Sequence, residues 1–199
     1  QAELDWWLRL LADWNRVAMM VPPAWVEPEH AAHMAPFTDA SRALGGDGRA
    51  CSGGAGAVFG NLAMQFDFSE EEITWLEICD LEGLVHVLWL AELCERCPEK
   101  LAGKRFLTWC DNQAFVGAVN AHQSNEPTLA FLLEVLHDLL ARYSFDIRIE
   151  FVPSAENVAA DAASRGDWDR FYAYMRTHAG LEASDIVMLN VQAQRRSSW

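Results

Sequence analysis

Four carboxylates occupy positions that packing alone does not explain. Asp39 interrupts an apolar stretch with the character of a strand, and strand interiors disfavour aspartate. Asp111 ends a second apolar run, where strands of α/β sheets commonly present functional groups. Asp161 lies among small residues that let a helix approach a sheet. Glu77 falls on the apolar stripe of an expected helix, where a carboxylate is either paired or binds a metal.

These residue types indicate metal-dependent phosphate chemistry. Carboxylates that converge without cationic partners repel one another, and divalent cations relieve that repulsion. Mg²⁺ prefers carboxylates together with water and the phosphate oxygens of a substrate. Two such ions ~4 Å apart can activate a water molecule and stabilise the leaving oxygen of a phosphodiester. No protein side chain then has to act as the nucleophile.

Each acid also has an ordinary explanation. Asp39 could belong to a turn or an edge strand, and Asp111 could cap the helix that follows it. Asp161 could pair with Arg165 one helical turn later, and Glu77 could be a solvated helix residue. The catalytic interpretation is favoured by the joint occurrence of the four acids in one order of elements.

The elements that must position these acids follow from periodicity and turn signals. Three short strands within 34–68 predict an antiparallel meander. Ser69 and Glu72 form a capping box that opens a helix over about 70–97. The order β-β-β-α-β-α-α-β-α predicts an α/β fold with a mixed five-stranded sheet, three antiparallel strands followed by two parallel ones, and helices on both faces. The two later strands are expected at 104–110 and 146–152, and the later helices at 114–121, 128–143 and from about 156.

The chain divides into three parts by pattern. Residues 1–33 predict an amphipathic helix followed by a Pro-rich connector. Residues 34–178 are expected to form the main domain, and residues 179–199 a C-terminal tail without a packing pattern. The apolar stripe of the first helix consists of Leu4, Trp7, Leu8, Leu11 and Trp14.

Composition limits the setting of the protein. The formal net charge of −14 opposes tight phosphate binding, which normally draws on clustered Lys and Arg. Part of that acidity is the expected metal site, and neighbouring domains could supply affinity for nucleic acid. Five scattered cysteines argue against a disulfide framework. With no signal peptide and no long apolar run, an intracellular protein of the cytoplasm or nucleus is expected, with no membrane partner.

Five short motifs resemble ribonuclease H domains of reverse-transcribing retroelements, especially those of DIRS-like retrotransposons. The resemblance spans about residues 34–166, and its last motif is the most specific. An earlier piece, E-L-D-W-W-L, resembles the segment that joins ribonuclease H to the polymerase in such elements. The five motifs are, in chain order, F-T-D-A-S, G-G-A-G-A-V, I-T-W-L-E, T-W-C-D-N-Q and F-V-P-S-A-E-N-V-A-A-D-A-A-S-R.

The resemblance implies a site for two Mg²⁺ ions, with Mn²⁺ as a substitute. Asp39 would bridge both ions, Glu77 and Asp111 would lie on one side, and Asp161 on the other. The implied substrate is an RNA–DNA hybrid, whose RNA strand is cut during reverse transcription. The implied partner is a polymerase domain of the same polyprotein, because this chain has no Y-x-D-D polymerase motif.

The resemblance also implies contacts to the RNA strand. Gln113 matches a position that often touches RNA, and Ser41, Asn112 and Asn157 are further candidates for substrate binding. The 2′-hydroxyls in the wide minor groove would distinguish RNA from DNA. Capping and turn hydrogen bonds are the ordinary explanation for these polar residues, and for Asn157 that explanation is equally favoured.

Two positions complicate the family pattern. Glu82 also precedes an apolar helical run and competes with Glu77 as the helix carboxylate; the I-T-W-L-E motif and the apolar stripe favour Glu77. Many ribonucleases H carry a histidine ten residues before the last aspartate, where this chain has Phe151. Metal-dependent catalysis can persist without that histidine, with slower turnover expected.

Two other functions remain open. A DNA-cutting nuclease would use the same carboxylates and cations, because fold alone does not fix the substrate. A catalytically weak or inactive scaffold domain within a larger polyprotein would account for the acidic charge and for Phe151. Retention of four mutually repelling carboxylates argues against the scaffold.

Overall fold

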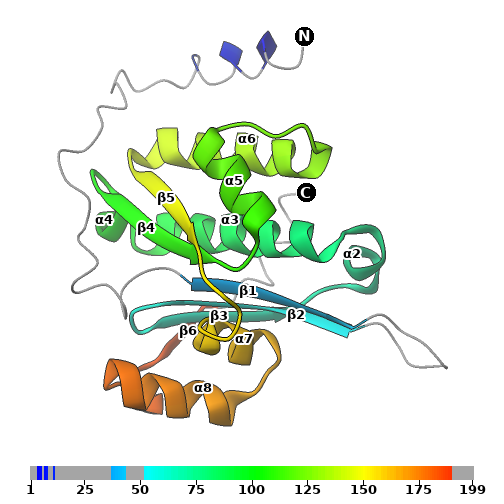
Figure 1. Ribbon diagram of the computed structural model, residues 1–199. Coiled ribbons are helices and arrows are strands. Elements are labelled where there is room, and N and C mark those ends of the chain that lie inside the picture. Colours follow the sequence, from blue (N-terminus) through cyan, green and yellow to red (C-terminus); the bar gives the residue numbers. More distant parts are fainter. Residues whose placement is uncertain (1–3, 6, 9–10, 12–36, 44–51, 190–199) are drawn as a thin grey trace.

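The computed structural model describes residues 4–5, 7–8, 11, 37–43 and 52–189, and these include a six-stranded mixed sheet (Figure 1). Its strand order is β5-β4-β1-β2-β3-β6. Strands β1, β2 and β3 form an antiparallel meander, and β4 and β5 continue the sheet in parallel from β1. This arrangement confirms the predicted mixed α/β sheet. The strands are β1 Phe37–Ala43, β2 Ser52–Phe59, β3 Leu62–Asp67, β4 Arg105–Cys110, β5 Asp146–Phe151 and β6 Val187–Leu189.

The sixth strand corrects the predicted count of five. β6 pairs in parallel with β3 at the edge of the sheet and lies within the segment predicted to be a tail. It has three residues, of which only Leu189 is buried, so it is too short to show the alternation that marks a strand in sequence. Residues 190–199 lie outside the described part of the chain.

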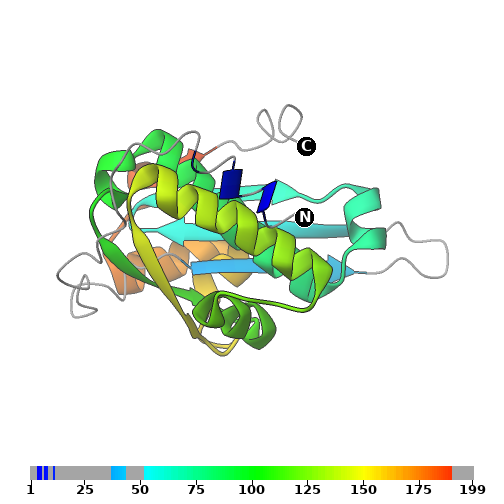
Figure 2. The ribbon, with the colours of Figure 1, turned by 90° about the horizontal axis from the view of Figure 1, so that it is seen from above.

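Helices cover both faces of the sheet, as predicted. Helices α3, α5 and α6 lie above it in Figure 1, while α7 and α8 lie below, and from above α6 is seen to cross the strands (Figure 2). Each face has its own group of buried apolar residues. The helices are α2 Glu70–Trp75, α3 Ile78–Arg96, α4 Pro98–Leu101, α5 Gln113–Ala121, α6 Pro127–Tyr143, α7 Val158–Ser164 and α8 Trp168–Tyr174, followed by a π-helical turn Met175–Ala179 and a 3₁₀ turn Ala183–Asp185.

The helix predicted over 70–97 is two helices, which is a correction. α2 ends at Trp75 with Leu76 as its C-cap, and Glu77 has the extended backbone of an N-cap, with φ −74° and ψ 162°. This stretch contains two capping boxes: Ser69 with Glu72 opens α2, and Glu77 with Asp80 opens α3. The second box restarts the helix, so Glu77 does not continue the apolar stripe of α3.

Helix α7 approaches the sheet unusually closely, because both surfaces are built from small residues. A Cβ on Gly54 would lie 2.2 Å from the carbonyl oxygen of Ser164, and one on Gly56 would lie 2.2 Å from that of Ala160. Gly56 is the residue on β2 that pairs with Asp39 on β1. The small residues on β2 therefore allow α7 to lie close to Asp39.

The described residues near the N-terminus, Leu4, Asp5, Trp7, Leu8 and Leu11, are helical and exposed. The rest of the predicted first helix and the connector lie outside the described residues. Within the part of the chain that the structure describes, no helix is long and apolar enough to cross a membrane.

Candidate active site

Three carboxylates converge where β1 and β4 run side by side. The two strands are parallel, with Thr38 paired to Cys110, so the next residues, Asp39 and Asp111, lie at the same edge of the sheet. Asp39 is 3% exposed. Glu82, in the first half of α3, lies near enough to both aspartates for their charges to raise the pKa of its carboxyl group. Helix α7 brings Asp161 toward Asp39 from the opposite face of the sheet.

The pKa values reveal how these acids affect one another. Burial raises the pKa of Asp39 to about 7, and the charges of Asp111 and Asp161 add to the rise, while a hydrogen bond from Ser164 and the charge of Arg165 oppose it. Burial likewise raises the pKa of Glu82 to about 8, with further contributions from Asp111 and Asp39. Carboxyl groups this strongly desolvated ionise readily at neutral pH only beside a compensating cation.

Glu77 lies outside this group. Its side chain is 79% exposed and forms an ion pair with Arg42, with 3.2 Å between Arg42 Nη1 and Glu77 Oε2. Glu77 is not among the charges that act on Asp39, whereas Glu82 is in electrostatic contact with both Asp39 and Asp111. The structure therefore brings together Asp39, Asp111, Asp161 and the alternative Glu82, and it does not bring Glu77 to them.

A buried histidine fixes the helix that carries Glu82. His86 lies one turn after Glu82 and is fully buried. Its Nδ1 is 2.9 Å from Thr38 Oγ1 on β1, and its Nε2 is 3.1 Å from Thr108 Oγ1 on β4. Burial lowers the pKa of His86 to about 3, so the ring stays neutral while it connects α3 to both strands. The Glu82/His86 spacing is the sequence signal that would have favoured Glu82 over Glu77.

Asp39 is held by a serine from the last motif. Ser164 Oγ donates to Asp39 Oδ2 at 2.5 Å, and the Ser164 carbonyl oxygen accepts from Ser41 Oγ at 2.8 Å. Ser164 is 3% exposed. The serine therefore connects α7 directly to the carboxylate in β1, which sequence reasoning missed.

Asp111 has one oxygen with a partner and one without. Ser154 Oγ donates to Asp111 Oδ2 at 2.9 Å. Oδ1 is buried and, among the described residues, has no hydrogen-bond partner. A buried carboxylate oxygen without a donor is unfavourable unless a cation occupies the space beside it. The donor set, carboxylate oxygens only, suits Mg²⁺ or Mn²⁺.

Asp161 has a different environment. Arg165 Nε lies 2.7 Å from Asp161 Oδ1, and Arg170 Nη1 lies 2.6 Å from Asp161 Oδ2. Burial would raise the pKa of Asp161, but the hydrogen bonds and charges of the two arginines outweigh it and lower the pKa. In the described part of the chain, no three acid, histidine or cysteine side chains are arranged to hold one metal ion as they stand.

The predicted substrate contacts separate into two kinds. Asn112 is buried: its side chain accepts from the backbone N–H groups of Ala114 and Phe115 and donates to the Cys79 carbonyl. Asn157 donates to the Thr38 carbonyl at 2.8 Å, and Ser41 bonds to backbone groups of Gly54 and Ser164. These three residues position the site.

Gln113 is the exposed member of the predicted contacts. It is the first residue of α5, two positions after Asp111. Its amide is therefore available to a ligand at the carboxylate edge of the sheet.

The position of the missing histidine is occupied by an apolar ring. Phe151 ends β5 and is 40% exposed. Its side chain cannot transfer a proton, so Phe151 itself gives no acid–base assistance.

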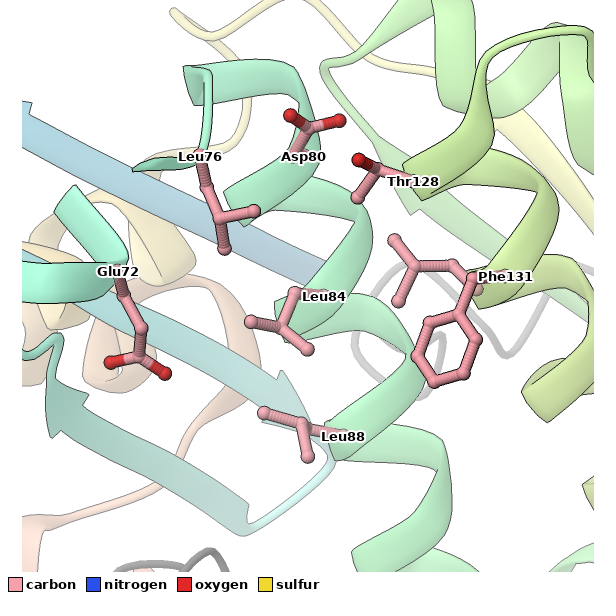
Figure 3. A pocket seen from close by; sticks show the side chains of 8 residues that line it. Glu72, Leu76, Asp80, Leu84, Leu88, Thr128 and Phe131 are labelled. Carbon is pink, nitrogen blue, oxygen red and sulfur yellow. The ribbon is translucent and has the colours of Figure 1, made fainter. Parts of the chain in front are cut away.

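A separate pocket of about 200 Å³ lies on the other side of α3, between α2 and α6 (Figure 3). Leu84 and Leu88 line it, and Leu84 stands about 200° around the helix from Glu82. The pocket therefore belongs to the face opposite the carboxylates and is no part of their site. Its other lining residues are Glu72, Leu76, Asp80, Thr128, Phe131 and Leu132.

No protein-family model and no curated protein sequence matches the chain. A similar solved structure is that of ribonuclease H1 from the halophilic archaeon Halobacterium salinarum NRC-1. The two chains are 18% identical, with a TM-score of 0.48, and the match covers 68% of this chain and 96% of that one. A likeness at this level assigns no reaction, and the carboxylate site carries the functional conclusion.

Proposed function

We propose that the chain is a divalent-metal-dependent endonuclease that hydrolyses the RNA strand of RNA–DNA hybrids. The observation that carries the proposal is the convergence of Asp39, Glu82 and Asp111 at one edge of the sheet. Burial raises the pKa values of Asp39 and Glu82, and none of the three acids has an ion-pair partner among the described lysines and arginines. Glu82 takes the role that the sequence had favoured for Glu77. The resemblance of the surrounding motifs supports the choice of hydrolysis and of a hybrid substrate.

Each carboxylate has a distinct task in this proposal. Asp39, between the others, would be shared by two ions; Glu82 and Asp111 would complete one side and Asp161 the other. Bound Mg²⁺ or Mn²⁺ would supply the activated water and stabilise the leaving oxygen. Ser164 orients Asp39 through its hydrogen bond, and His86 holds Glu82 against the sheet.

Gln113 supports selection of RNA over DNA. It is exposed at the edge where Asp111 lies, and an amide can both donate to and accept from a 2′-hydroxyl. The net charge of −14 limits hybrid affinity. We therefore infer that a polymerase domain of a retroelement polyprotein, acting in the cytoplasm or nucleus during reverse transcription, supplies much of the binding.

The decisive experiment is cleavage of a labelled RNA–DNA hybrid in Mg²⁺ or Mn²⁺, with double-stranded RNA, double-stranded DNA and the Asp111→Asn variant as controls. We expect cutting of the RNA strand of the hybrid alone, lost in the variant. Cutting of double-stranded DNA instead would assign a DNA nuclease. Absence of cutting at high enzyme and low salt, both alone and with the polymerase domain, would overturn the proposal.

One observation favours a second candidate, a catalytically idle scaffold domain. Both oxygens of Asp161 are occupied by arginines, which an idle domain could retain as a structural ion pair. Divalent-ion binding distinguishes the two candidates. A folded scaffold with this pairing would bind no second ion, whereas the nuclease would bind two.

A further inference from the structure

The carboxylate of Asp161 is doubly engaged by cationic side chains. Each oxygen has its own guanidinium: Arg165 on Oδ1 at 2.7 Å and Arg170 on Oδ2 at 2.6 Å. The side chain of Asp161 is 13% exposed, whereas those of Arg165 and Arg170 are 59% and 43% exposed. The acid is therefore fixed within the fold, and its partners reach it from the solvent side.

The backbone prepares this arrangement. α7 ends at Ser164, and Gly166 adopts a positive φ of 67°, which reverses the chain so that α8 begins beside α7. The side chain of Asp167 caps α8 and accepts from the backbone N–H of Arg170 at 3.2 Å. The backbone of Arg170 is thus held by a contact that does not involve its guanidinium, so the side chain alone has to move to release Asp161.

Arg165 also acts beyond Asp161. Its charge lowers the pKa of Asp39, and the charge of Asp39 in turn raises the pKa of Arg165. The guanidinium therefore lies in the electrostatic field of the two carboxylates that a second cation would share. It partly supplies the positive charge that such a cation would bring.

We propose that Arg165 and Arg170 form an arginine latch, which holds Asp161 in the absence of a second divalent ion and competes with that ion for the carboxylate. The inference rests on the proposed function, because it assigns Asp161 to the second ion. Occupancy is then ordered: a first ion binds at Asp39, Glu82 and Asp111, and a second binds only when the guanidinium groups leave Asp161.

The latch is strong enough to matter and weak enough to open. Half-exposed arginine–carboxylate pairs contribute modestly to binding equilibria, so we expect the latch to lower the affinity for the second ion by about 3- to 10-fold. Arginine does not lose its proton in proteins, so raising the pH does not release Asp161. Where Asp161 is ionised, a divalent cation that binds its carboxylate can displace the guanidinium groups.

The test is Mn²⁺ titration of the purified chain by calorimetry, which reports binding without requiring activity. The wild type should bind two ions with different affinities. In the Arg165→Gln/Arg170→Gln double variant, the weaker ion should bind about 3- to 10-fold more tightly. The affinity of the stronger ion should change less, because the two arginines contact Asp161 directly and Arg165 acts on Asp39 only through its charge. Arg176→Gln is the matched control, because Arg176 is 61% exposed and pairs with Glu182; its two affinities should equal those of the wild type.

A double-mutant cycle isolates the contact from the general loss of positive charge. In an Asp161→Asn background, the two arginine substitutions should change the affinity for Mn²⁺ much less, because only their general charge effect remains. An equal gain with and without Asp161, or no gain with Asp161 present, would overturn the latch. Hybrid cleavage is scored separately: cleavage without coupling rejects the latch alone, and coupling without cleavage rejects the proposed nuclease alone.

Discussion

The two halves of the carboxylate site solve the same electrostatic problem in opposite ways. On the β1–β4–α3 side, burial dominates, and Asp39 and Glu82 have pKa values raised to about 7 and about 8. On the α7–α8 side, two arginines lower the pKa of Asp161. The first half is short of positive charge and the second already has it. Burial and the presence or absence of an arginine partner, rather than residue type, therefore determine which carboxylates would be stabilised by a bound cation.

The largest expected effect comes from removing the acid that lies between the two halves. Asp39→Asn should lower the rate of hybrid cleavage by roughly 10³-fold or more, about 4 kcal/mol of transition-state stabilisation, because both ions lose a shared ligand. Single-turnover cleavage in Mg²⁺ is the measurement. Asp169→Asn, an exposed acid on α8, is the control and should retain wild-type rates. Comparable rates in the two variants would remove Asp39 from the mechanism.

The identity of the helix carboxylate gives the next largest effect. Glu82→Gln should reduce single-turnover cleavage by about 10²-fold, because it removes a charge from the half whose site carboxylates have no arginine partner among the described residues. Glu77→Gln should change the rate by less than about 3-fold, since it loses only a surface ion pair with Arg42. The two substitutions are chemically identical and five residues apart, so each controls for the other. A larger loss in the Glu77 variant would restore the role that the motif favoured.

That pair of residues also shows how far sequence reasoning reaches. Asp39, Asp111 and Asp161 were found because each breaks the pattern of its own element, which is local information. The choice of Glu77 assumed one continuous helix, in which Glu77 shares a face with the apolar residues that follow. A second capping box starts a new helix at Glu77, so that assumption about its face fails. The structure forms both capping boxes, Ser69 with Glu72 and Glu77 with Asp80, whereas only the first was identified from the sequence.

The mixed sheet and its antiparallel-then-parallel order were predictable, because they follow from periodicity and connection lengths. The short strand β6 was not, since three residues carry no period. The arginine partners of Asp161 were foreseen only in part: Arg165 follows from helical spacing, but Arg170 belongs to the next helix and reaches Asp161 only through the turn at Gly166.

Moving α7 should disturb the two halves together. Gly56→Ala places a Cβ 2.2 Å from the Ala160 carbonyl oxygen and 2.4 Å from the Ser164 nitrogen, both backbone atoms that cannot yield without moving α7. We expect a loss of about 1–3 kcal/mol in unfolding free energy, measured by urea denaturation, together with slower cleavage. Gly117→Ala is the matched control, because its Cβ would meet nothing within 4 Å, and it should stabilise α5 slightly. Equal stabilities in the two variants would show that α7 does not depend on Gly56.

The last expected effect is a pH dependence of opposite sign in the two halves. Asp39 and Glu82 have raised pKa values, so in chelator the folded chain binds more protons than the unfolded chain between about pH 4 and pH 8, and the unfolding free energy should fall as pH rises through that window. Asp161 has a lowered pKa, so its contribution is present above about pH 4 and is lost as pH falls below it.

Urea unfolding of the metal-free chain at pH 5 and pH 8 separates the two contributions. The wild type should lose about 3–6 kcal/mol of unfolding free energy between these values. Asp39→Asn and Glu82→Gln should each flatten the decline, and the exposed-acid control Glu77→Gln should keep it. Adding Mg²⁺ at pH 8 should restore much of the loss, because the cation favours the ionised carboxylates. If the unfolding free energy of both Asp39→Asn and Glu82→Gln declines as in the wild type, the β1–β4–α3 half is not short of positive charge. The arginines beside Asp161 would then be the whole difference between the two halves.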